Sequence, residues 1–150
     1  MARLFTIDAS VFLNAFHHRE EGHQSSRRFL DLVRAGSHPI IVPTLVLPEV
    51  AAVLTRAQAD ADRARAFARQ LERLPNLVLV PLDIALAREA VEAVARGSMR
   101  GSDAVYAAVA QRFGSVLVSR DSRQRQRVAP AVQALAPEEA VVELSGPPPM

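Results

Sequence analysis

The sequence predicts an α/β fold in which helices cover both faces of a mostly parallel sheet. Short apolar runs of strand length alternate along the chain with longer segments whose apolar residues recur at helical spacing. Strands that are buried on both faces of a parallel sheet have this continuous apolar character. Strands that alternate with helices in this way are typical of a layered α/β domain.

The expected elements follow one another without an internal repeat or linker. We expect strands at 4–7, 39–43, 77–80, 115–118 and, as an edge strand, 131–135. Helical apolar spacing marks residues 11–16, 29–33, 46–54, 64–74, 84–94 and 105–109, and an Arg-rich helix is expected at about 122–128. Asp83 and Gly97 are end signals for the fifth of these helices. The polar stretch 17–25 is expected to be a loop, and 137–144 to form one or two helical turns.

The 150 residues fit one domain, which we place at 1–144, followed by a Pro-rich tail at 145–150 that we expect to be disordered. The chain contains no cysteine, which excludes disulfides, zinc–thiolate sites and thiol catalysis. No apolar run is long enough to span a bilayer, and the N-terminus lacks the apolar segment of a signal peptide. We therefore expect a cytoplasmic protein that has no contact with the membrane.

All 18 basic residues are arginine. A GC-rich genome would explain this preference, but the distribution of the charges is more informative. The segment 96–127 has only two acids, Asp103 and Asp121, and seven arginines: Arg96, Arg100, Arg112, Arg120, Arg123, Arg125 and Arg127. Arginine suits bidentate phosphate contacts. A basic zone around two acids indicates a polyanionic partner beside a cation site.

Four acidic residues stand near the carboxyl ends of expected strands or at the starts of the helices. Asp8 directly follows the first strand, and Asp121 lies just after the fourth; Glu49 and Asp103 lie early in their helices. Ligands of parallel α/β sheets bind beyond the carboxyl ends of the strands, so we expect these carboxylates to converge. Oxygen ligands of this kind hold Mg²⁺, and metal ions bound there could activate a water and stabilise the leaving oxygen in phosphodiester cleavage.

Each acid taken alone has a simpler explanation. Asp103 would be favoured by the helix dipole, Asp121 would cap the next helix, and Glu49 would pair with a surface arginine. Asp8 is harder to explain in this way, because an unpaired carboxylate at the end of a buried strand is costly. The joint pattern is more specific than any of its members.

Four stretches, in order and at the right spacing, resemble the signature of PIN-domain ribonucleases, and in particular of VapC-type toxins of type II toxin–antitoxin systems. They are Ile7-Asp8-Ala9-Ser10-Val11, the stretch Pro48–Leu54, the stretch Gly101–Ala110 and Val118-Ser119-Arg120-Asp121. The resemblance covers roughly residues 4–141. It implies a three-layer α/β/α fold and RNA cleavage that depends on Mg²⁺ or Mn²⁺ and leaves a 5′-phosphate.

The resemblance also assigns roles to residues. The family's acidic positions match Asp8, Glu49, Asp103 and Asp121, which we expect to be the catalytic residues and metal ligands. Ser119 matches a Thr/Ser position near the metal centre, and Ser10 stands where a small polar residue is common. Some relatives carry a further acid near the last motif, where this chain has Ser122, Arg123 and Gln124, so one or two metals remain open.

The expected partners are an RNA substrate, a cognate antitoxin near the helices of 44–74 and a second copy of the chain. The candidates for RNA binding are Arg100, Arg120, Arg123 and Arg127, although the Arg-rich helix could also be a solvated face. We interpret the histidines as solvated, and Tyr106 as a core residue rather than a stacking platform.

Other functions are less compatible with the sequence. The chain has no lysine, which argues against a receiver-like phosphoacceptor domain and a Walker-A site. A PIN-type RNA-processing or DNA-cleaving nuclease outside a toxin–antitoxin system remains the nearest alternative. A catalytically inactive PIN-like binding module is another, and the intact acid set argues against it.

Overall fold

Five parallel strands form the centre of the protein, in the order β3-β2-β1-β4-β5. The computed structural model describes residues 3–146, so residues 1, 2 and 147–150, which include most of the predicted tail, lie outside the described part. The predicted α/β fold and its parallel sheet are confirmed. The strands are β1 (Phe5–Ile7), β2 (Ile40–Pro43), β3 (Leu77–Val80), β4 (Val116–Val118) and β5 (Ala134–Leu135).

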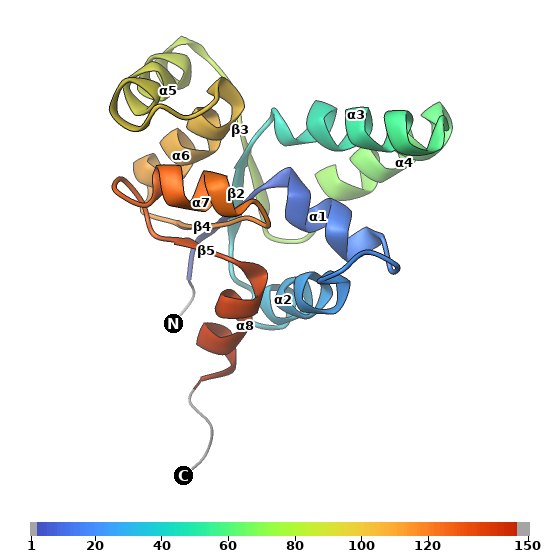
Figure 1. The fold of residues 1–150 in the computed structure, drawn as a ribbon. Coiled ribbons are helices and arrows are strands. Elements are labelled where there is room, and N and C mark those ends of the chain that lie inside the picture. Colours follow the sequence, from blue (N-terminus) through green and yellow to red (C-terminus); the bar gives the residue numbers. More distant parts are fainter. Residues whose placement is uncertain (1–2, 147–150) are drawn as a thin grey trace.

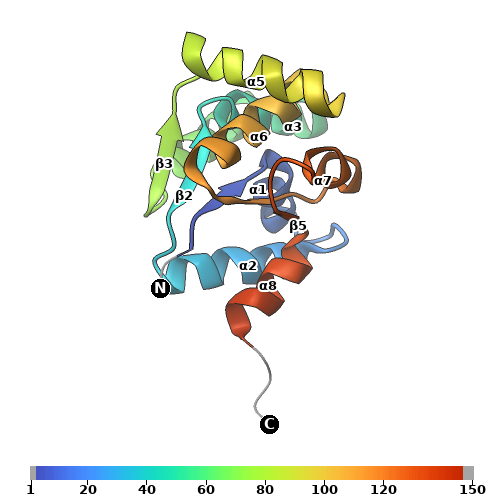
Figure 2. The same cartoon turned by 90° about the vertical axis from the view of Figure 1, so that its left-hand side faces the viewer.

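Helices cover the sheet on both sides, as Figures 1 and 2 show. One layer contains α5 (Ile84–Gly97), α6 (Gly101–Phe113) and α7 (Ser122–Val128). The other contains α1 (Ala9–Phe16), α2 (His23–Ala35), α3 (Val46–Gln58), α4 (Ala61–Glu72) and α8 (Pro137–Ser145). Among the described residues, no helix has both the length and the apolarity that a bilayer crossing requires.

Aspartates begin four of these helices. The side chains of Asp8, Asp60, Asp83 and Asp121 each accept hydrogen bonds from backbone N–H groups in the first turn of the helix that follows. These N–H groups have no partner inside the helix, so a carboxylate at this position stabilises the helix start. The predicted helix start at Asp83 is therefore confirmed.

The predicted loop at 17–25 is wrong over its last residues, because α2 already begins at His23. A buried asparagine organises this turn. The side chain of Asn14 donates to Glu20 and to the Glu21 carbonyl, and its Oδ1 accepts from Ser26 at 2.6 Å. The first turn of α2 is polar, so apolar spacing could not reveal where the helix starts.

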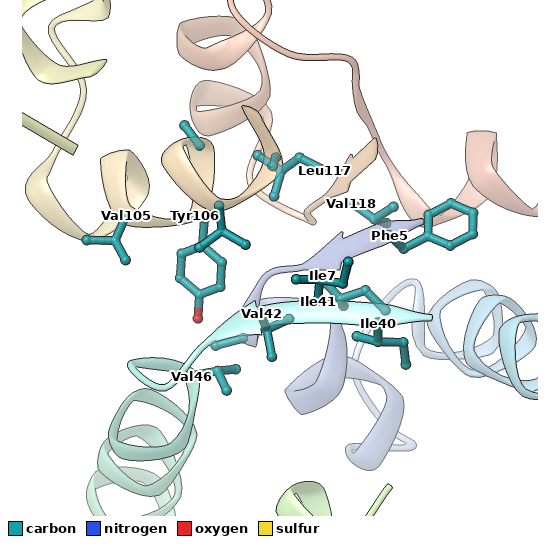
Figure 3. Close-up of a cluster of buried hydrophobic side chains, with 14 of the residues drawn as sticks. Phe5, Ile7, Ile40, Ile41, Val42, Val46, Val105, Tyr106, Leu117 and Val118 are labelled. Atoms are coloured by element: carbon teal, nitrogen blue, oxygen red, sulfur yellow. The ribbon is translucent and has the colours of Figure 1, made fainter. Parts of the chain in front are cut away.

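The core lies where β1, β2 and β4 meet α6 on one face and α1 and α2 on the other. Phe5, Ile7, Val42 and Leu117 are fully buried. Figure 3 shows these residues packed together, with the Tyr106 side chain reaching from α6 toward the end of β2 and the start of α3. Apolar burial of this extent is the main force that holds the layers together.

The strand order creates a crevice at one end of the sheet. From β1, the chain builds outward through β2 and β3, then crosses back to place β4 and β5 on the other side of β1. The connections on the two sides of β1 therefore lie on opposite faces of the sheet. In such sheets, ligands bind at this point of reversal, beyond the carboxyl ends of the strands. Here that point lies between the ends of β1 and β4.

Candidate active site

Asp8 stands directly at the reversal point, where β1 ends and α1 begins. Its backbone N–H donates to the Val118 carbonyl at the end of β4, over 3.0 Å. Its carboxylate accepts the Ser10 N–H at 3.1 Å. The Ser10 hydroxyl in turn accepts the N–H of Arg120, so it joins the ends of the two strands. The backbone thus holds Asp8 beside the segment that leads to Asp121.

Glu49 enters from the first turn of α3 and is held by Tyr106 of α6. The Tyr106 hydroxyl donates to Glu49 Oε1 over 2.6 Å, and the tyrosine is almost completely buried. A buried hydroxyl requires a partner, and the carboxylate provides it. The predicted core location of Tyr106 is correct. Its bond to Glu49 was missed, because α3 and α6 are far apart in sequence.

Asp103 and Asp121 come from two further elements and share one arginine. Asp103 lies in the first turn of α6 and is only 5% exposed. The Arg100 guanidinium donates through Nε to Asp103 Oδ2 at 3.2 Å and through Nη2 to Asp121 Oδ2 at 3.3 Å. Asp121 also caps α7 by accepting the N–H of Arg123 and of Gln124. The capping role and a place in the site are therefore compatible for Asp121.

The structure brings the four acids together around one pocket of about 430 Å³. Its polar and charged lining consists of the four acids with Ser10, Arg56, Arg100, Ser102 and Gln124, beside a group of small and apolar residues. Four segments that are distant in sequence therefore present carboxylates to a common space. Ser119 lies behind them, fully buried, and its hydroxyl accepts the Asp121 N–H at 3.0 Å.

Burial and mutual repulsion act on two of these carboxylates. Burial raises the pKa of Asp8, and the charge of Asp103 adds to this effect, against the hydrogen bonds from Ser10. Burial also raises the pKa of Glu49, with contributions from the charges of Asp8 and Asp103, while the Tyr106 hydrogen bond opposes the rise. Carboxylates that repel one another in a half-buried pocket favour binding of a cation between them.

The donor chemistry of the pocket fits a hard divalent cation. Within residues 3–146, no three acidic or histidine side chains are arranged as a ready metal cage. Mg²⁺ does not need such a cage, since it keeps several waters and takes one or two carboxylates together with substrate phosphate. In the present geometry, Arg100 balances the charge of Asp103 and Asp121. The oxygen donors suit Mg²⁺ or Mn²⁺, which prefer such ligands over sulfur.

The predicted RNA-binding arginines occupy different surroundings. Arg100 lines the pocket. The Arg120 guanidinium turns away from it, donating to Glu138 at 2.6 Å and to the Glu21 carbonyl. Arg123 is exposed and Arg127 half-buried on α7, and neither lines the pocket. Their roles in RNA binding remain predictions.

Arg56 and Gln124 are among the residues that line the pocket but were not singled out from the sequence. Arg56 lies on α3 seven positions after Glu49, and this spacing places two residues on the same helix face. This helical spacing could have identified Arg56 from the sequence. Gln124 is 1% exposed and lies in a helix whose sequence is almost uniformly polar, so nothing in the pattern distinguished it from its neighbours.

The fold and the site together define a three-layer α/β/α protein with an acidic pocket at the reversal point of its sheet. The model of the PIN domain family matches residues 5–129, and the chain belongs to this family. The predicted family is therefore confirmed. The comparison with curated proteins gives no significant match.

Solved structures with the same fold include VapC-type toxins. A chain of the VapBC2 complex of Rickettsia felis, bound to a promoter DNA fragment, superposes with a TM-score of 0.68 and 12% identity, covering 89% of this chain and 98% of that chain. VapC20 of Mycobacterium tuberculosis, a toxin that cleaves the sarcin-ricin loop, superposes with a TM-score of 0.67 and 20% identity. The match covers 82% of this chain and 93% of that chain. A chain of the DNA-bound VapBC complex of Salmonella typhimurium superposes with a TM-score of 0.67 and 18% identity, covering 91% of this chain and 99% of that chain.

Proposed function

We propose that this protein is a metal-dependent endoribonuclease and the toxin of a toxin–antitoxin pair. The observation that carries the proposal is the convergence of Asp8, Glu49, Asp103 and Asp121 on one pocket, in a chain of the PIN family. PIN domains in general depend on a divalent metal. VapC20, which shares the fold, cleaves an RNA loop. The acids and the fold together support RNA hydrolysis.

The residues of the pocket would have different roles in hydrolysis. Asp8, Asp103, Asp121 and Glu49 would hold Mg²⁺ or Mn²⁺, which when bound supplies an activated water and a positive charge beside the leaving oxygen. Tyr106 keeps Glu49 turned inward. Arg100 is mostly exposed and can move from the carboxylates to a substrate phosphate. Water adds to phosphorus, the 3′ oxygen leaves with a proton, and the product carries a 5′-phosphate.

The test is cleavage of a structured RNA by the purified chain. We expect fragments with 5′-phosphate ends in Mn²⁺ or Mg²⁺, none after chelation with EDTA, and recovery when excess Mn²⁺ is added back. Cleavage that continues unchanged in EDTA would overturn the proposed metal dependence. A protein that binds Mn²⁺ but leaves every RNA tested intact, and instead cuts single-stranded DNA, would favour the DNA-cleaving alternative.

An antitoxin is the proposed protein partner, and an apolar groove suits it. The groove has a volume of about 270 Å³ and lies between α1, α2 and α4. Its apolar side chains include Phe12, Phe16, Phe67, Leu71 and Leu74, with Arg27, Asp31 and Arg34 also in the lining. An amphipathic antitoxin helix with apolar residues at helical spacing would fit such a surface. Three of these apolar residues belong to the stretch 44–74 where we expected the antitoxin.

A binding measurement tests this partner. The antitoxin would be a small protein that is encoded beside this one, and its tail could insert an arginine among the carboxylates, where Arg100 now lies. Changing Phe67 to Asp should abolish co-purification while leaving RNA cleavage intact. Retention of the complex by this variant would contradict the placement of the groove, and a solitary gene whose expression leaves growth unaffected would contradict the toxin role.

A homodimer and a cytoplasmic location are also part of the proposal. Apolar side chains are exposed on α5, with Ile84 67% and Val91 64% exposed. A second copy of the chain could cover them, since an apolar patch of this kind often marks an interface. Sedimentation of the wild type and of Val91→Glu tests this. A wild-type monomer at high concentration would contradict the dimer.

A further inference from the structure

The side chain of Gln124 is the one buried group of the pocket whose hydrogen bonding is incomplete. Gln124 lies on α7, is 1% exposed and lines the acid pocket. Among the described residues, its Nε2 is the only buried side-chain nitrogen or oxygen without a hydrogen-bond partner. Leaving such a buried donor unsatisfied is costly. A polar atom that stays unpaired at this cost inside a candidate active site points to a use there.

The other end of the Gln124 amide is firmly fixed. Gln124 Oε1 lies 2.5 Å from the Ser119 hydroxyl oxygen. This distance is typical of a short O–H···O bond and too short for a bond from an amide nitrogen. The Ser119 oxygen already accepts the Asp121 N–H, so its own proton is free to go to the glutamine. The oxygen of the amide is therefore assigned to Ser119, and the NH₂ group to the opposite side.

Asp8 lines the same pocket as this NH₂ group. The Gln124 side chain is close enough to lower the pKa of the Asp8 carboxyl, against the effect of burial. The two residues line the same pocket, one from the end of β1 and one from α7. Ser119 and Gln124 thus connect the backbone of Asp121 to the pocket that Asp8 also lines.

We propose that Gln124 is a positioning residue for Asp8, and that one Nε2–H group of Gln124 donates to the Asp8 carboxylate when this carboxylate holds a divalent cation. The inference rests on the proposed metal site. A carboxylate that shares its charge between a cation and a fixed donor is held in one rotamer, and residues that orient metal ligands in this way affect metal affinity strongly. Gln124 is not a catalytic residue, because it acts through Asp8.

The test is Mn²⁺ affinity, measured by calorimetry on RNA-free protein. Gln124→Met keeps nearly the same side-chain volume and removes both hydrogen-bonding groups. Removing a partner of a metal ligand typically weakens metal binding by about 10- to 100-fold, and we expect a loss in this range. The matched control is Gln126→Met on the same helix, where the side chain is exposed and the affinity should not change. Circular dichroism confirms that the variants are folded, and Gln124→Leu replaces the methionine variant if that one is not.

A second comparison separates positioning from general loosening of the site. In an Asp8→Asn background, Gln124→Met should weaken residual Mn²⁺ binding by less than about twofold, because the residue that it positions is gone. An equal loss in both backgrounds would overturn the proposal, as would a wild-type affinity in folded Gln124→Met. Wild-type protein that binds no Mn²⁺ would instead overturn the proposed metal site, and this inference with it.

Discussion

At the scale of single residues, Asp8 combines burial with a negative charge that Asp103 repels. Both effects raise its pKa above the ordinary value of 3.8, so the folded state holds the proton to a higher pH than the unfolded state. The free energy of unfolding therefore falls as pH rises through this interval. The free-energy cost of burying the charged Asp8 carboxylate is fully present above its raised pKa in the folded state. This cost is absent below about its ordinary pKa.

Asp8→Asn should therefore raise the melting temperature at neutral pH, and the gain should vanish as the pH falls toward about 4. Asparagine can still accept the Ser10 N–H, so the start of α1 remains capped. The control is Asp62→Asn, a change at a carboxylate that is 96% exposed and does not line the pocket. Thermal melts across the pH range check this, and an Asp8→Asn protein less stable than wild type at neutral pH would contradict it.

The residue scale also shows which parts of the site were predictable. Asp8 directly follows one apolar strand and Asp121 lies just after another, so the sequence alone places both near the carboxyl edge of the sheet. Tyr106 contacts Glu49 on a helix that is distant in sequence. Gln124 contacts Ser119 from a helix whose polar sequence does not distinguish it from its neighbours. Their hydrogen-bond partners depend on the packing of α6 and α7, which residue spacing does not encode.

At the scale of elements, Tyr106 links α6 to α3 through Glu49. Tyr106→Phe keeps the buried ring and removes the hydrogen-bond donor. We expect the free energy of unfolding to fall by about 1–2 kcal/mol. This loss lies near the lower end of the range for hydrogen bonds to charged groups, because water in the pocket can reach Glu49. The pKa of Glu49 should rise further, since this hydrogen bond opposes its rise.

Metal-dependent activity of Tyr106→Phe should then disappear at a higher pH than that of the wild type as the solution is acidified. A pH profile of RNA cleavage at saturating Mn²⁺ provides the measurement. Leu71→Met, a change in the core away from the pocket, is the control for small decreases in stability. Identical acid limbs for Tyr106→Phe and wild type would contradict the positioning of Glu49.

The helix α7 carries a second prediction at this scale. Arg125 donates to the Ser119 carbonyl at 2.7 Å and Arg120 pairs with Glu138, so both have structural contacts. For Arg123 and Arg127, no side-chain hydrogen bond or ion pair is found within the described residues. These two are therefore the arginines of this segment that are free to bind phosphate.

Changing Arg123 and Arg127 to Ala should weaken RNA binding and reduce its salt dependence by about 0.7 in log–log slope for each phosphate that is no longer neutralised. Mn²⁺ affinity should stay as in the wild type, because the carboxylates remain. The matched control changes Arg65 and Arg69, which have the same spacing on α4 and are exposed. Equal slopes for the wild type and the α7 variant would leave α7 as a solvated helix without a role in RNA binding.

At the scale of the whole molecule, the alternation of strands and helices predicted the layers and the parallel sheet. It did not predict that β1 would lie at the centre, between β2 and β4. The strands have similar apolar composition, so composition alone does not reveal which of them lies at the centre. This strand order places the ends of β1 and β4 side by side. Asp8 and Asp121 follow these two ends, and they therefore lie in one site.

The central claim is that carboxylates gathered at this point of the sheet carry out metal-dependent RNA cleavage. The most direct test compares initial cleavage rates of one structured RNA in Mn²⁺ for the wild type, Asp103→Asn and the exposed control Asp62→Asn, each purified free of other nucleases and shown to be folded. We predict that the rate of Asp103→Asn falls at least about 100-fold, a change of about 2.7 kcal/mol in activation free energy, and that Asp62→Asn matches the wild type. Wild-type cleavage by folded Asp103→Asn would contradict the claim.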